Sequence, residues 1–208
     1  HGYVAEKDGF GIAGARLKVE EGGSGTIKLR RRNLAERLYR VTGYGLYRDT
    51  VLLGKEAPIA EPLGSGMVVG QDSVLAVPYR GKVRWFWGDT ARISYPLGLF
   101  RMSGATSDLP DKGALDPSVG VNLKYFTGDD GFSRAMAEVA NPEGVVWVFG
   151  VATVPDSSGN ECMVGHFTRR KGLGEEYEHG MMLYNDERDV FEVKATLPLS
   201  DRWRYLHA

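Results

Sequence analysis

The chain has a single cysteine, no long apolar run and almost no net charge, and each absence excludes a class of protein. Cys162 stands alone among 208 residues, so no internal disulfide can form. This favours a reducing compartment, although many exported bacterial proteins also lack disulfides. No apolar run approaches the roughly 18–20 residues of a membrane-spanning helix. The formal net charge of −1 gives no overall field that would attract nucleic acid or an anionic membrane.

Motifs for the common catalytic and cofactor chemistries are also missing. The chain contains no Walker loop, no HExxH and no GxSxG. Residues 9–14 match a dinucleotide fingerprint as text, but no apolar strand precedes them and no long helix follows. His1 could brace a copper ion, yet His166, His179 and His207 are not at ligand spacing. We therefore expect no cofactor and no metal. Because the chain starts at His1 rather than Met, the absence of a signal peptide does not bear on export.

Glycine and aromatic residues are abundant instead. The 28 glycines, 10 tyrosines, 8 phenylalanines and 4 tryptophans indicate turns and aromatic strands, so we expect a mainly β protein. In residues 1–32, alternating apolar and polar side chains predict strands at 15–19 and 26–30, joined by the glycine-rich turn 21–25. Two strands are too few to fold alone. This segment therefore reads as the end of a small β-sandwich domain whose earlier strands are missing.

A short helix and a linker are predicted next, in residues 33–66. Asn33 can cap a helix with Glu36 three residues later, and Gly43 supplies the stop. Prolines and glycines between residues 54 and 66 are typical of a linker.

The most informative stretch is residues 70–90. Its alternating pattern on both sides of Arg80-Gly81 predicts a β-hairpin. In the second strand, Trp85 and Trp87 share one face and Phe86 lies on the other.

Further strands are expected from residue 67 onward, at the spacing of a repeated four-strand unit with inserted loops. They are expected near 100–107, 120–126, 145–153, 161–168, 180–184 and 190–193. The pattern predicts a partial β-propeller of about two four-stranded blades. The expected domains are thus a partial β-sandwich at 1–32, a capped helix and linker at 33–66, and propeller-like blades at 67–208.

Two carboxylates stand where the regular pattern of the hairpin stops. Asp72 could be the base of a sugar-cleaving site, or a strand-end Asp that hydrogen-bonds turn amides. Asp89, with Thr90 and Arg92, could hold a turn or form a polar contact in the central channel of a propeller. Trp85 and Trp87 could stack on a sugar ring, but such residues are more often part of a core.

A basic cluster at 28–32, with Arg37 and Arg40, could grip an anionic polymer. A solvated face is the favoured interpretation, because no aromatic residues interleave with the cluster and the net charge is slightly negative.

Two resemblances follow from these residues. Residues 33–54, 70–73 and 86–90, together with 94–98 and 104–107, resemble large uncharacterised proteins of planctomycete-type bacteria, which provide no activity to carry over. More distantly, residues 70–200 are similar to the five-bladed propeller of arabinanase- and invertase-type glycosidases. In that family an Asp opens the inner strand of the first blade, ahead of a hairpin like 81–90.

The resemblance implies a set of site residues. The catalytic candidates are Asp72, as base, and Asp89; the candidates for substrate binding are Trp87, Arg92, Tyr95 and Arg134. Residues 133–140 would take the place of the second inner strand, but they contain no matching Asp. The resemblance names no general acid, and Glu178 is expected near an outer loop.

We expect a glycoside hydrolase-like, polysaccharide-processing protein that is a fragment of a larger chain and works outside the cytoplasm. Its expected partners are a polysaccharide or oligosaccharide and the remaining blades of the propeller, with no nucleic acid and no membrane. The alternative is a non-catalytic propeller that binds carbohydrate or protein, because propellers host both functions. A third possibility is an independent small domain whose strands close on themselves.

Overall fold

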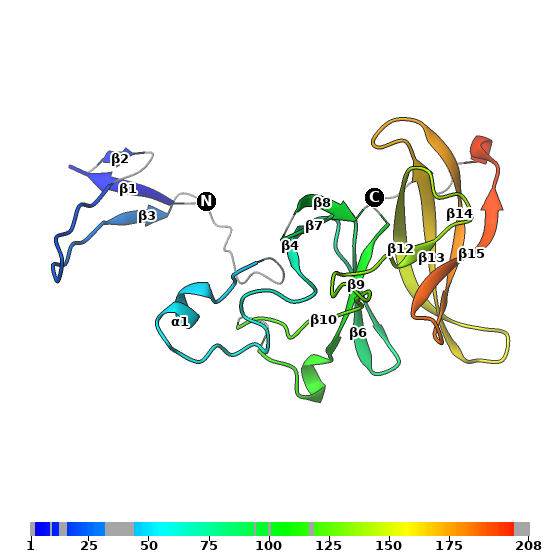
Figure 1. Ribbon diagram of the computed structural model, residues 1–208, viewed down its shortest axis with the longest axis horizontal. Helices are drawn as coiled ribbons and strands as arrows, with labels where there is room; N and C mark the ends of the chain where they lie inside the picture. The colour runs from blue at the N-terminus through cyan, green and yellow to red at the C-terminus, as the bar shows by residue number, and fades with distance from the viewer. Residues whose placement is uncertain are drawn as a thin grey trace. The chain divides into compact units, whose positions relative to one another are not determined.

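The computed structural model describes residues 3–8, 10–12, 16–31, 44–93, 95–99, 101–116 and 119–201. The chain divides into two compact units, residues 1–38 and residues 39–208, and each is built mainly from β-strands (Figure 1). The prediction of a mainly β protein is confirmed. None of the helices in the described ranges is long and apolar enough to cross a membrane.

The first unit contains one small antiparallel sheet in the order β2-β1-β3. Its strands are β1 (Tyr3–Lys7), β2 (Phe10–Ile12) and β3 (Leu29–Arg31). The prediction of a strand at 15–19 is wrong for residues 16–19, which are described and form no strand. The strand predicted at 26–30 begins only at Leu29. Alternation predicted both, but a strand forms only where a partner backbone pairs with it, and β1 pairs with residues 29–31 alone on that side.

The described part of the second unit opens with a short helix, α1 (Arg48–Leu52), which has no buried residue. The helix predicted from Asn33 to Gly43 lies outside the described residues. A three-stranded antiparallel sheet in the order β4-β7-β8 was not predicted. Its strands are β4 (Val68–Gln71), β7 (Thr90–Arg92) and β8 (Tyr95–Leu99).

The predicted hairpin is confirmed as β5 (Leu75–Tyr79) and β6 (Lys82–Trp87). Arg80 and Gly81 have φ of 46° and 74°, and positive φ at both central residues is the type I′ geometry that suits a two-residue hairpin. Two further strands, β9 (Ser103–Asp108) and β10 (Lys124–Tyr125), extend the hairpin to a four-stranded sheet in the order β10-β9-β6-β5. A 3-10 helix, Pro110–Lys112, follows β9.

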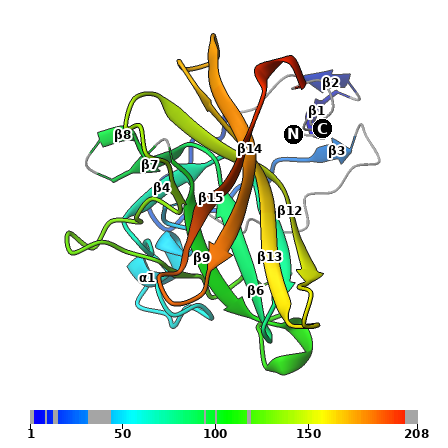
Figure 2. The ribbon, with the colours of Figure 1, turned by 90° about the vertical axis from the view of Figure 1, so that its right-hand side faces the viewer.

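A five-stranded sheet in the order β11-β15-β14-β13-β12 forms the C-terminal part of this unit. Its strands are β11 (Ala137–Glu138), β12 (Val145–Pro155), β13 (Glu161–Arg170), β14 (Glu176–Asn185) and β15 (Val190–Leu197). The last four form a meander at the predicted places, and the sheet curls like half of a barrel (Figure 2). Neither this sheet nor the four-stranded sheet closes on itself in the described ranges.

The interpretation of residues 133–140 as the inner strand of a second blade is wrong. The strand that forms there, β11, has only two residues and pairs in parallel with β15, the last strand of the meander, rather than with β12. Glu178, expected near an outer loop, lies within β14 and forms an ion pair with Arg169. Sequence gives the order of strands along the chain, but a two-residue strand is too short to carry a pattern that identifies its neighbour.

The two larger sheets share one hydrophobic core. Phe86 of β6 is fully buried, and its ring centroid lies 5.0 Å from that of Phe191 and 6.1 Å from that of Tyr184. Met102, Met136, Met163 and Met182 are also buried in this cluster. Unbranched methionines fill the irregular space between two sheets that curve differently.

We predict that Phe86→Ala destabilises the second unit by about 3–5 kcal/mol, because it removes a buried ring and leaves a cavity between the sheets. Chemical denaturation followed by circular dichroism measures the change. Val74→Ala is the matched control, since Val74 is 58% exposed and its truncation should cost no more than about 0.5 kcal/mol. A loss below about 1 kcal/mol for Phe86→Ala would contradict the shared core.

Candidate functional site

The two predicted catalytic carboxylates lie next to each other. The backbone amide of Asp72 donates to the carbonyl of Asp89 at 3.4 Å, and the amide of Gly88 donates to the carbonyl of Asp72 at 2.9 Å. Asp72 is exposed and Asp89 is half-buried. Their proximity follows from the hairpin, because residues before β5 and after β6 meet at the open end of the same strand pair.

Gly88 makes room for the carboxylate of Asp72. A Cβ atom at position 88 would lie 3.0 Å from Asp72 Oδ1 and 3.2 Å from Ser73 Cβ. Any larger residue would therefore push the Asp72 side chain away. Glycine is needed at position 88 because the side chain of Asp72 approaches the backbone closely there. Its φ is not positive, so the backbone angle does not require glycine.

Asp89 also receives a hydrogen bond from the five-stranded sheet. The indole Nε1–H of Trp147, on β12, donates to Asp89 Oδ1 at 3.1 Å. Burial raises the pKa of Asp89, the indole hydrogen bond lowers it, and the nearby charge of Asp72 raises it further, so the pKa lies above its ordinary value of 3.8. A carboxyl group with a raised pKa beside a second, exposed carboxylate is an arrangement that general acid–base chemistry uses.

The tryptophans of β6 are split between core and surface. Trp87 is only 2% exposed, and its ring packs 5.4 Å from that of Tyr125. It is therefore not available as a sugar platform in this structure. Trp85 is half-buried and stacks on Trp87 at 6.1 Å with an interplanar angle of 9°.

The remaining predicted substrate-binding residues do not gather around the carboxylate pair. Arg92 forms an ion pair with Asp130 at 2.9 Å, and its guanidinium lies 4.1 Å from the ring centroid of Phe132. Arg134 donates to the carbonyls of Arg188 and Asp189 at 2.9 and 3.0 Å. Both arginines therefore have partners within the protein.

Tyr95 lies in β8, where its backbone pairs with that of Arg92. Its side chain is outside what the structure describes.

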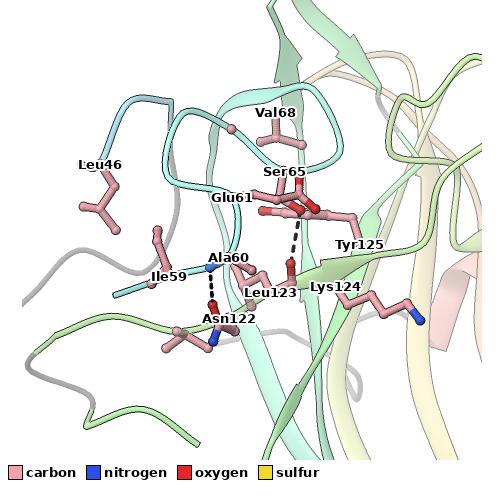
Figure 3. A pocket seen from close by; sticks show the side chains of 12 residues that line it. Leu46, Ile59, Ala60, Glu61, Ser65, Val68, Asn122, Leu123, Lys124 and Tyr125 are labelled. Atoms are coloured by element: carbon pink, nitrogen blue, oxygen red, sulfur yellow. Dashed lines mark hydrogen bonds between the residues drawn. The ribbon is translucent and has the colours of Figure 1, made fainter. Parts of the chain in front are cut away.

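A cavity of about 340 Å³ lies between residues 46–68 and residues 121–125, and neither Asp72 nor Asp89 lines it. Leu46, Ile59 and Val68 give it apolar walls (Figure 3). Two of its polar side chains are occupied: Asn122 accepts from the Ala60 amide at 2.8 Å, and Ser65 donates to the Leu123 carbonyl at 3.1 Å. These bonds tie the two segments together.

A second cavity, of about 220 Å³, lies over Trp85 and Val83. Residues 107–115 and 120–122 form its other walls. The sequence indicated Trp85 as a possible platform, but not the loop that encloses the space above it. Trp147 was missed altogether, because nothing in β12 shows which distant residue its indole reaches.

Two histidines that are not at ligand spacing in the sequence lie side by side in space. His166 Nε2 and His179 Nδ1 are 3.4 Å apart on the neighbouring strands β13 and β14. His179 is fully buried, and its Nε2 lies 2.8 Å from the carbonyl oxygen of Pro198. Across the described ranges, no group of three or more His, Cys, Asp or Glu side chains is placed to hold a metal ion.

Comparison with protein-family models, with curated proteins and with solved structures finds no match to this chain. The carboxylate pair and the cavity over Trp85 are thus the features on which a function can be argued.

We predict that Asp89→Asn stabilises the protein relative to wild type as the pH rises from about 4 to 7. The raised pKa means that the folded state holds the Asp89 proton more tightly than the unfolded state. That contribution is full below pH 3.8 and is lost as the pH rises through the folded pKa, whereas Asn stays neutral and keeps an acceptor for Trp147. Thermal unfolding across this pH range should show that the melting temperature of Asp89→Asn rises relative to wild type by no more than about 2 °C. The effect is small because solvent screens a half-exposed charge.

Glu187→Gln, on an exposed turn, is the control and should show no such pH-dependent gain. A constant difference between Asp89→Asn and wild type at all pH values would contradict the raised pKa.

Proposed function

We propose that the chain belongs to a glycoside hydrolase-like protein that processes a polysaccharide outside the cytoplasm, with Asp72 and Asp89 at its reaction site. The observation that carries the proposal is that Asp89 has no cationic partner among the residues that the structure describes. Two other partly buried aspartates have one: Asp186 pairs with Arg80 at 2.8 Å, and Asp189 pairs with Arg84 at 3.2 Å. Asp89 has an indole N–H and a second carboxylate instead.

This difference argues for function because it costs stability. A carboxylate that only holds a fold is placed beside a cation or several amides, which lower its pKa. Asp89 is placed so that its pKa rises. Glycoside hydrolysis needs one carboxyl group that keeps its proton, to protonate the leaving oxygen, and one carboxylate that acts as base or nucleophile. Asp89 suits the first role and the exposed Asp72 suits the second.

The propeller remains part of the proposal. The four-stranded sheet and the β12–β15 meander are each up-and-down sheets, and they pack face to face as neighbouring blades do. The resemblance to arabinanase- and invertase-type glycosidases supports the same assignment.

A non-catalytic carbohydrate-binding scaffold is the second candidate. Trp87, Arg92 and Arg134, the residues expected to hold a sugar at a catalytic site, contact other parts of the protein instead. This observation favours the scaffold. A catalytic site would need other side chains to hold the sugar beside Asp72 and Asp89.

We predict that Asp72→Asn and Asp89→Asn each lower the rate of hydrolysis at least about 100-fold, the usual contribution of a positioned acid or base. The measurement is release of reducing ends from a panel of neutral and acidic polysaccharides, with Glu187→Gln as the control. Turnover that is unchanged in both variants removes the catalytic assignment. Binding without turnover by the wild type supports the scaffold. If the wild type neither binds nor hydrolyses any of the polysaccharides, the proposed function is contradicted.

A further inference from the structure

We propose that the cavity over Trp85 binds one ring of a neutral sugar, stacked on the free face of the indole. The geometry of the indole is the first argument. Its Nε1–H donates to Ser107 Oγ at 2.9 Å, so the polar edge of the ring is already used. Its stack on Trp87 covers one face. The cavity is lined by Val83 and Trp85 and not by Trp87, which favours the face of the indole that is turned away from Trp87.

The size of the cavity limits the ligand. Its volume of about 220 Å³ is below the roughly 300–1,000 Å³ of pockets that enclose drug-sized ligands. It therefore accommodates a single ring, with the rest of a longer saccharide in solvent. Apolar walls come from Pro110, Ala114 and Leu115, which suit the C–H face of a pyranose or furanose.

The polar groups of the rim select a neutral, hydroxyl-bearing ligand. Asp108 and Asn122 line the cavity and are exposed. The oxygen of Asn122 accepts from the Ala60 amide, but a carboxylate accepts hydrogen bonds from hydroxyl groups and a side-chain amide NH₂ donates to them. Among the described lining residues Asp108 alone carries a formal charge, and Lys82 already pairs with it. A cationic ligand would have to compete with Lys82, and an anionic ligand would meet the carboxylate without a free cation beside it.

A row of aromatic rings next to the Trp85 indole holds this surface in place before any ligand binds. Tyr125, Trp87 and Trp85 follow one another on the outer face of the four-stranded sheet. Trp87 is fixed by burial, and Trp85 is fixed by Trp87 and by Ser107. Little side-chain freedom is then lost on binding, which favours affinity. This site is separate from Asp72 and Asp89 and does not depend on hydrolysis at that pair.

The test is a titration of the 208-residue chain with methyl glycosides of glucose, galactose, mannose, xylose and arabinose, followed through the tryptophan indole N–H signals in ¹H–¹⁵N spectra. The Trp85 signal is assigned by its loss in Trp85→Leu. We expect at least one glycoside to shift this signal at millimolar concentration while the Trp147 signal, beside the carboxylate pair, stays unchanged.

Two variants test the geometry. Trp85→Leu keeps apolar bulk but loses the flat ring, and Ala114→Phe fills the cavity without removing a contact that holds the fold. Trp85→Leu should weaken binding about tenfold, because the flat face that the sugar stacks on is lost. Ala114→Phe should weaken it about tenfold or more, because the added ring occupies the cavity. Glu187→Gln, on an exposed turn, is the control and should bind as the wild type does.

Three results would overturn the proposal. One is the absence of a Trp85 shift with every glycoside, and another is a shift that persists with full affinity in Ala114→Phe. The third is a shift with choline but not with glycosides, which would make the site a cation–π site instead. A shift confined to Trp147 would contradict this cavity and support the site at Asp72 and Asp89.

Discussion

The fold of the second unit depends on the aromatic contact between its two larger sheets. Phe86 reaches from β6 to Tyr184 and Phe191, whose rings lie 5.2 Å apart. Side chains alternate along a strand, so burying Phe86 forces Trp85 and Trp87 to the opposite face. The packing of the core thereby decides which aromatic rings are left over for the outer face, and the cavity over Trp85 exists as a consequence.

The parts of this architecture that could be predicted are those whose signals are local. The hairpin of β5 and β6 is marked by alternation and by the Arg80-Gly81 turn, and the long strands β12–β15 have clear patterns of their own. Short strands such as β4, β7 and β11 carry too few residues to show a period. Their existence depends on distant partners: β7 pairs with β4 across the whole hairpin, and β11 joins β15 more than fifty residues later.

The same division holds for the candidate site. The proximity of Asp72 and Asp89 could be predicted, because the two residues flank one hairpin. The donation from Trp147 could not, since it needs β12 to lie beside the end of β6. Arg92 and Arg134 were candidates for substrate binding, as the resemblance implied. Each has an internal partner in the structure that only the tertiary fold reveals.

The shape of the cavity over Trp85 is set by backbone geometry as much as by side chains. Gly113 ends the 3-10 helix at φ 90°, and Gly120, on the other wall, has φ 151°. A side chain is strained at such angles. Above Gly113 there is open space, whereas a Cβ at Gly120 would lie 3.2 Å from Ile59 Cγ2. The described residues of this loop thus leave a cavity beside the indole. Protein interiors are close-packed, so a cavity of this kind, lined by described residues and an aromatic ring, favours a ligand at this position.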